Sequence, residues 1–137
     1  MPELSEGRIR HLEMIQGAVN RLAGNSAMVK RYAIAVTAGA VALGEARVLE
    51  APVFVGALAV VVAFFAWLDA MYLKTEGAYR RLFNAVRQSD QETGFSLSPH
   101  GYQRSVWRSI VSWSVAGFYG PLVALILLML LFIGNGA

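Results

Sequence analysis

The chain has 137 residues, of which 56% are hydrophobic and only 15% are charged, and its mean hydropathy is +0.49. A soluble domain of this size rarely has so few charges, and the composition therefore indicates a membrane protein. The length leaves no room for a separate catalytic domain. Because the chain has no cysteine, disulfides, thiolate metal sites and a cysteine nucleophile are excluded.

The N-terminal segment predicts an amphipathic helix over about residues 5–23. Its apolar residues recur at helical spacing on one face: Ile9, Leu12, Ile15, Val19 and Leu22. Glu6 and Arg10 stand four residues apart on another face and are expected to pair. Gly24-Asn25 is typical of a helix C-cap and Ser26 of the next N-cap, so we predict a break before the following helix.

Three apolar segments predict membrane-spanning helices at about 28–46, 53–73 and 109–133. The third is uninterrupted, because no charged side chain follows Arg108, and about 20 apolar residues suffice to cross a bilayer. The second begins after Pro52 and carries aromatic residues toward its far end, as an interfacial belt does. The first has only 13 uncharged residues, or roughly 20 Å of helix, so Lys30 and Arg31 would have to snorkel to the interface.

The basic residues predict the orientation in the membrane. Lys and Arg number five in residues 1–31, one in residues 44–52 and six in residues 73–108. Under the positive-inside rule, both large groups face the cytoplasm. An even number of crossings must separate two cytoplasmic segments, so the first two spans form a hairpin and the third span leaves the C-terminus outside. The expected topology is therefore N-in and C-out.

We expect a single all-α membrane domain over residues 1–137, with a cytoplasmic helical subdomain made of residues 1–26 and 74–108. The second helix should extend beyond the membrane to about residue 88 and pack its apolar face on the N-terminal helix. After a polar loop, Ser98-Pro99 is expected to supply the N-cap and N1 residues of the third helix.

Asp69 is the one acidic residue that lies inside a hydrophobic stretch, since Glu45 only bounds the apolar run of the first span. Ionisable residues in membrane spans are costly and often functional, as proton relays or as the lining of a pathway, which makes Asp69 an intramembrane functional candidate. The alternative is a structural carboxylate near the cytoplasmic interface, reached by water or paired with Lys30, Arg31 or Arg108.

Small residues form rows on two of the predicted spans. Ala35 and Gly39 on the first, and Ala116 and Gly120 on the third, would let helix backbones approach closely and are candidates for an interface between subunits. The alternative is packing inside one subunit. Pro121 removes a backbone hydrogen bond and is expected to kink the third span, either as the hinge of a gate or only as a packing bend.

Five arginines form a predicted basic cytoplasmic rim: Arg80, Arg81, Arg87, Arg104 and Arg108. The rim could receive a phosphate-bearing signal or anionic headgroups, or its charges could serve only to set the topology. The chain has no glycine-rich phosphate loop, no HExxH helix and no Ser/His/Asp grouping. We therefore expect no enzyme activity, no catalytic, cofactor-binding or metal-binding residues, and no cofactor.

Two stretches of the chain carry a resemblance: RHLEMIQGAVNRLAGNSAMVK (residues 10–30) and FFAWLDAMYLKTEGAYRRLFNAVR (residues 64–87). They resemble a family of small, largely uncharacterised bacterial multi-pass membrane proteins. Members share an Arg-His-Leu-Glu-Met-Ile-Gln start, a Trp-Leu-Asp-Ala-x-Tyr-Leu second span and a Tyr-Arg-x-Leu stretch, and the likeness continues in WSVAGFYGPL (residues 113–122). The resemblance implies a bacterial inner-membrane location but no activity.

In size and layout, the chain is also similar to short membrane effectors of anti-phage systems, which oligomerise and breach the inner membrane. We therefore expect an oligomeric effector or pore-type protein. Its partners would be the lipid bilayer, further copies of itself and a cytoplasmic protein or nucleotide signal, but no nucleic acid. Two alternatives stay open: a membrane-anchoring or scaffolding subunit that docks a cytoplasmic partner, and a small ion-coupled transporter that depends on Asp69.

Overall fold

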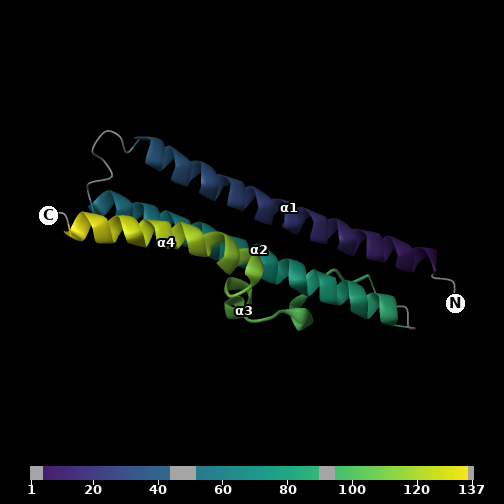
Figure 1. Cartoon of the computed structure of the whole chain (residues 1–137). Coiled ribbons are helices and arrows are strands. Elements are labelled where there is room, and N and C mark those ends of the chain that lie inside the picture. The colour runs from purple at the N-terminus through teal and green to yellow at the C-terminus, as the bar shows by residue number, and fades with distance from the viewer. Residues whose placement is uncertain (1–4, 44–51, 90–94, 136–137) are drawn as a thin grey trace.

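The computed structural model describes residues 5–43, 52–89 and 95–135, and every regular element in these ranges is a helix. The elements are α1 (Glu6–Leu43), α2 (Pro52–Gln88), the 3₁₀ turn η3 (His100–Tyr102), α3 (Val106–Ile110) and α4 (Trp113–Asn135) (Figure 1). At about 1.5 Å per residue, α1 and α2 each extend roughly 55 Å. The all-α class predicted from the sequence is confirmed.

The first helix is continuous, and the break predicted at Gly24–Ser26 is wrong. Residues 5–23 and the described part of the predicted span 28–46 belong to one helix, α1, while residues 44–46 lie outside the described residues. A stripe of buried residues runs along α1, spaced by three or four positions except for one gap of seven, about two helical turns, between Val19 and Ser26: His11, Ile15, Val19, Ser26, Val29, Ala33 and Thr37. Ser26 belongs to this stripe, so packing against α2 overrides its local preference for a cap.

The second helix runs unbroken through Gly77 to Gln88, so its predicted extension to about residue 88 is confirmed. On that extension, Leu82 and Val86 pack on Ile15 of α1, and this confirms the predicted contact with the N-terminal helix. Arg8 closes this end of the helix pair, because its guanidinium donates to the Val86 and Arg87 carbonyls at 2.8 and 2.9 Å. Those carbonyls belong to the last turn of α2, where no backbone partner is left for them.

The start of the third helix differs from the prediction. Ser98-Pro99 precedes η3, and Pro99 makes no side-chain cap bond. The chain then forms the short α3 and turns at Val111 and Ser112, and α4 begins at Trp113 rather than at the predicted residue 109. Ser112 explains the turn, because its hydroxyl donates to the Ser109 carbonyl at 2.6 Å, a local bond that competes with the helical pattern.

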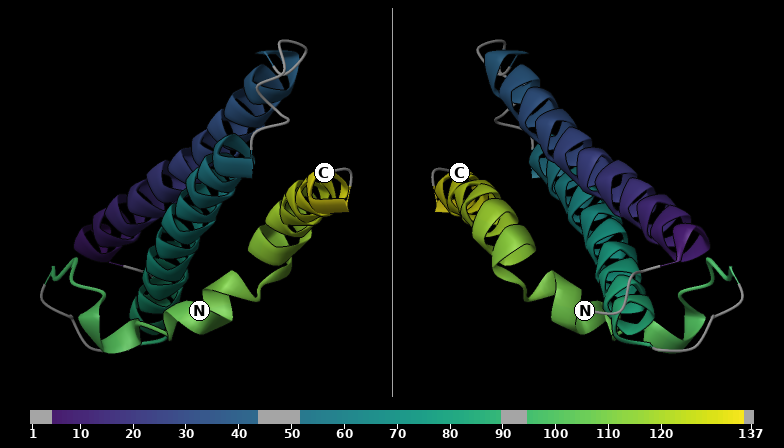
Figure 2. Two further views of the ribbon diagram at one scale, coloured as in Figure 1. Left: turned by 90° about the vertical axis from the view of Figure 1, so that its left-hand side faces the viewer. Right: turned by 90° about the vertical axis from the view of Figure 1, so that its right-hand side faces the viewer.

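The long helices lie along one another, with α2 between α1 and α4 (Figure 2). The main core lies among these three helices, and its buried residues are Ala33, Val55, Leu58, Val62, Ala70, Val115, Tyr119 and Ile126. The first turn of α1 lies at the opposite end of the molecule from the last turn of α4 (Figure 1). Because α1 and α2 are antiparallel, the first half of α1 faces the last half of α2.

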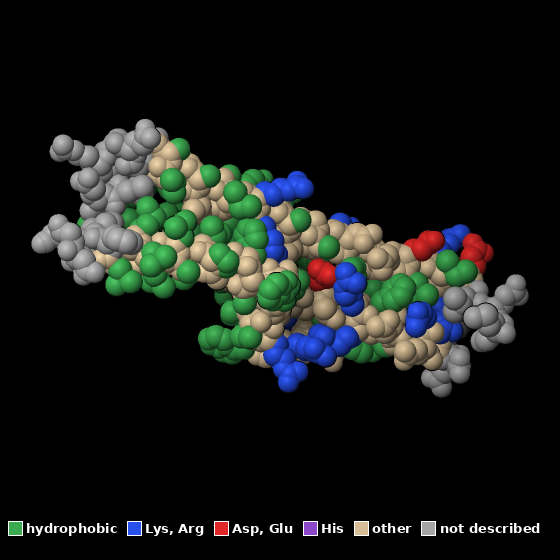
Figure 3. Space-filling view, viewed as in Figure 1, with side chains coloured by type: hydrophobic (Ala, Val, Ile, Leu, Met, Phe, Trp, Pro, Cys, Tyr) green, Lys and Arg blue, Asp and Glu red, His purple; other side chains and the backbone are tan. Residues whose placement is uncertain are grey.

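Two helices are long and apolar enough to cross a membrane: α2 and the Trp113–Leu131 part of α4. Hydrophobic side chains gather over α4 and the adjoining half of α1, whereas charged side chains lie mainly over the other half of the molecule (Figure 3). Within the described residues, α1 is not among the helices that satisfy this measure of length and hydropathy. The apolar surface is therefore concentrated at the end of the molecule that contains α4.

Candidate functional site

Asp69 of α2 is fully buried and has two partners on α1. Its Oδ2 pairs with Lys30 Nζ at 2.5 Å, and its Oδ1 accepts a hydrogen bond from the Ser26 hydroxyl. Lys30 Nζ also donates to Ser26 Oγ at 3.1 Å and lies over the Phe118 ring of α4, 5.9 Å from the ring centre. This cluster of Asp69, Lys30 and Ser26, which we call the ion-pair cluster, joins α1 to α2 and touches α4.

The ion-pair cluster lies at the end of the apolar half of α2. Asp69 follows Pro52 by 17 residues, or about 26 Å of helix, which is close to the thickness of a hydrocarbon core. The Asp69 carboxylate is 0% exposed and the Lys30 side chain 19% exposed, so each charge is compensated mainly by the other. Such a pair holds two helices in register, because separating them would leave a buried charge without a partner.

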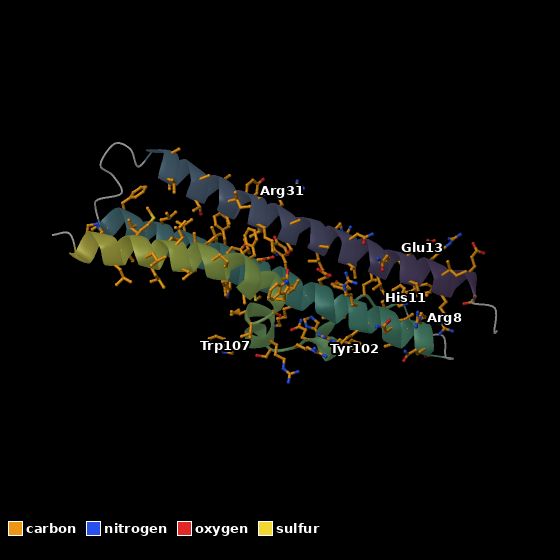
Figure 4. All side chains as sticks on the ribbon, in the orientation of Figure 1. Arg8, His11, Glu13, Arg31, Tyr102 and Trp107 are labelled. Atoms are coloured by element: carbon orange, nitrogen blue, oxygen red, sulfur yellow. The ribbon has the colours of Figure 1, made fainter. Side chains whose placement is uncertain are left out.

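Of the three predicted partners of Asp69, the structure selects Lys30. Arg31 is exposed and points away from α2 (Figure 4), and Arg108 belongs to a different group of side chains. Ser26 was not predicted as a partner of Asp69, because a serine after Gly24-Asn25 is typical of a helix N-cap. Its spacing of four residues from Lys30 was the available signal, since that spacing places both side chains on one helical face.

A basic pocket of about 150 Å³ lies where α2, α3 and the start of α4 meet. The polar side chains that line it are Lys74, Arg81, Arg104, Arg108, Ser109 and Ser112. Arg81 Nε donates to the Tyr102 carbonyl at 2.7 Å, while Arg81 Nη2 is buried and has no hydrogen-bond partner among the described residues. Burial and the nearby charge of Arg104 lower the pKa of Arg81. Within the part of the chain that the structure describes, the pocket therefore has positive charge that no lining carboxylate compensates.

The predicted basic rim is thus divided in two. Arg81, Arg104 and Arg108 come together in the pocket, and Lys74 joins them, although the sequence analysis did not select it. Arg80 instead pairs with Glu76 along α2, with Nε and Oε1 2.7 Å apart, and the Arg87 side chain is exposed near the end of the helix. Helical periodicity explains the division, because Arg80 and Arg81 point about 100° apart around α2.

The small residues predicted at an interface all lie on the surface of the described structure. Ala35 and Gly39 on α1, and Ala116 and Gly120 on α4, are exposed. The small residues that pack within the subunit are others: Ala33 is buried in the core and Ala40 packs on it. The four predicted residues are therefore not covered by other parts of the described structure, and their place in an interface between subunits stays a prediction.

His11 and Tyr119 are two further buried polar side chains. His11 is buried, with Nε2 3.1 Å from the Ser96 carbonyl and its ring against Phe95. Within the described residues, no three His, Asp or Glu side chains are grouped so that they could hold a metal ion. The hydroxyl of Tyr119 is buried without a hydrogen-bond partner in the same ranges. α4 continues as one helix through Pro121, where a hinge stays a prediction.

No family model matches the chain, and no curated protein or solved structure matches it significantly. The resemblance to small bacterial membrane proteins therefore stays a prediction.

Proposed function

We propose that the protein is an oligomeric effector or pore-type protein of the bacterial inner membrane. In this proposal, the second half of α1, the first half of α2 and α4 cross the bilayer in the N-in and C-out orientation. Charge placement supports the orientation, since eleven of the twelve basic residues fall on one side of the proposed spans. A role in anti-phage defence rests only on the likeness in size and layout to such effectors.

The exposed rows of small residues are the observation that carries this proposal. A Cβ atom added at Gly39 or Gly120 would meet nothing within 4 Å, so both glycines leave an open, shallow surface. In lipid, helices associate through close packing of such faces rather than through the exclusion of water. Three helices are too few to enclose a water path, so any permeation requires several copies around an axis.

Replacing Gly39 with leucine tests the proposed interface. Because a Cβ atom added at Gly39 meets nothing within 4 Å, the position has open space around it, so the subunit should still fold and insert, but neighbouring copies could no longer approach closely. We expect a smaller or altered assembly by native mass spectrometry or light scattering in mild detergent. Gly17→Leu is the matched control, because Gly17 lies on the same helix with nothing within 4 Å but far from the proposed spans.

Two outcomes would change the proposal. A wild-type protein that is monomeric in several detergents and in nanodiscs would contradict the pore-type function. If Gly39→Leu leaves the number of subunits unchanged, the interface is expected on α4 instead, and Gly120→Leu is the variant that tests it.

The docking-subunit alternative has an observation in its favour. Apolar side chains are exposed at the end of the molecule that lies in the cytoplasm in this proposal: Ile9 at 43%, Met14 at 43%, Phe95 at 63% and Leu97 at 41%. A cytoplasmic partner could cover them. Ion flux across liposomes that contain the purified oligomer separates the two functions, because a docking subunit conducts nothing.

The ion-coupled transporter has less support. Asp69 is buried and already paired, whereas a carboxylate that binds and releases ions needs access to water. A flux that depends on pH and disappears in Asp69→Asn, with the oligomer intact, would nevertheless favour the transporter.

A further inference from the structure

The basic pocket has the chemistry of an anion site. Four cationic side chains line it, no acidic side chain among the described residues lines it, and the hydroxyls of Ser109 and Ser112 lie beside them. The nearby carboxylate of Glu76 is held by Arg80 on α2 and is not part of the lining. Like charges gathered in one pocket repel one another, so a bound anion would stabilise the arrangement.

Arg81 is the group that is best placed to hold such an anion. Its Nε is fixed by the Tyr102 carbonyl, which orients the planar guanidinium, while its buried Nη2 has a hydrogen to donate and no acceptor in the described part of the chain. A Cβ atom added at Gly77 would lie 3.8 Å from Nη1 of Arg81, so the missing side chain leaves room beside the guanidinium. Guanidinium groups bind phosphate through two parallel hydrogen bonds, a geometry that a single lysine does not offer.

The surroundings of the pocket suit a phosphate group at a membrane surface. Trp107 and Trp113 flank the pocket residue Arg108 in the sequence and are 73% and 91% exposed. Trp107 points away from the long helices (Figure 4). Exposed tryptophans beside arginines are typical of the headgroup level of a bilayer, where phosphates are abundant. The long helix α4 also begins beside Ser112, so its N-terminus adds positive potential at the edge of the pocket.

We propose that the pocket formed by Lys74, Arg81, Arg104 and Arg108 binds a phosphate group. The group belongs either to an anionic phospholipid or to a soluble phosphate ligand, since both present the same oxygens. This inference goes beyond the proposed function and needs only a single copy of the chain. Its lipid version additionally rests on the proposed position in the membrane.

Binding in a neutral detergent tests the pocket with two probes. Native mass spectrometry measures how much phosphatidylglycerol is retained per subunit, with phosphatidylcholine as the uncharged comparison. Calorimetry measures the binding of inorganic pyrophosphate. We expect Arg81→Gln and Arg104→Gln each to weaken binding of the phosphate-bearing probe about tenfold or more, because each removes a charge-assisted hydrogen bond.

Arg87→Gln is the matched control, since it removes the same charge from the same helix outside the pocket and should leave binding unchanged. Arg104 is exposed, so its variant keeps the test valid if Arg81→Gln fails to fold.

Each outcome decides the proposal. Loss of phosphatidylglycerol alone in the pocket variants supports a lipid headgroup, and loss of pyrophosphate binding alone supports a soluble ligand. If neither probe binds, or if Arg87→Gln weakens binding as much as Arg81→Gln, the proposal is overturned. The same mass spectra report the number of subunits, so a monomer that still retains the phosphate probe would contradict the proposed oligomer and leave the pocket supported.

Discussion

At the scale of single residues, the charges of this chain fall into two kinds. Asp69 and Lys30 are paired across two helices, whereas Arg81, Arg104 and Arg108 share a pocket in which no carboxylate of the described ranges opposes them. The first arrangement fits a structural role, because both charges are compensated within the subunit. The pocket fits the recognition of an anion, because a counter-charge for its arginines has to come from outside the described residues.

A double-mutant cycle tests the structural role of the ion pair. Lys30→Met leaves the Asp69 charge buried without its cation, and Asp69→Leu leaves Lys30 without its anion, so we expect each single variant to lose about 3–5 kcal/mol of stability. The double variant Lys30→Met/Asp69→Leu should recover most of that loss, because neither charge is left behind. Thermal unfolding in detergent provides the measurement. Losses that simply add in the double variant would show that the pair is not coupled.

At the scale of the elements, the continuity of α1 is the feature that most affects the architecture. One helix joins the arm that carries His11 and Ile15 to the segment that carries Ala33 and Gly39. A displacement at one end of such a helix is carried to the other end, whereas a break at Gly24 would have separated the two parts. α1 thus connects the N-terminal arm directly with the proposed subunit interface.

Gly24→Ala distinguishes a continuous helix from a broken one by the sign of its effect. Gly24 is exposed, and a Cβ atom added there meets nothing within 4 Å. Inside a helix, alanine is favoured over glycine by about 1 kcal/mol, so we expect the variant to unfold at a higher temperature. If the helix ended at Gly24 with a left-handed cap, the same change would destabilise the protein instead.

At the scale of the whole molecule, the charged and apolar surfaces lie at different ends. The ion-pair cluster marks the boundary between them, with the apolar half of α2 before Asp69 and the basic pocket beyond it. This division agrees with the proposed hairpin of α1 and α2, in which the two predicted basic segments face the same compartment.

Reporter fusions test the proposed topology. Alkaline phosphatase folds only outside the cytoplasm, so a fusion after Ala137 should be active, and one in the loop of residues 89–98, part of which lies outside the described residues, should be inactive. A matching green fluorescent protein fusion should give the opposite pattern. Activity in the loop and none at the C-terminus would contradict the N-in and C-out orientation.

The all-helical class, the apolar character of α4 and of the first half of α2, and the extension of α2 to Gln88 could all be predicted from the sequence. These features depend on runs and spacings of residues along one segment, so local physical chemistry is sufficient to predict them. The pairing of Glu6 and Arg10 is a further feature that the sequence predicts, because the two residues are one helical turn apart. In the structure, Arg10 Nη2 lies 2.7 Å from Glu6 Oε1.

Features that depend on how distant segments align could not be predicted from the sequence and became visible in the folded chain. Ser26 has the local pattern of a cap, but in the structure its hydroxyl donates to Asp69 of α2. The five predicted rim arginines form two groups, because α3 and the start of α4 pack on one side of α2 only. Arg8 could not be assigned to the end of α2, because 78 residues separate it from Val86. At Ser26, contacts between segments outweigh a local capping preference of about 1 kcal/mol. For the arginines, no spacing along the chain records which distant residue supplies the contact.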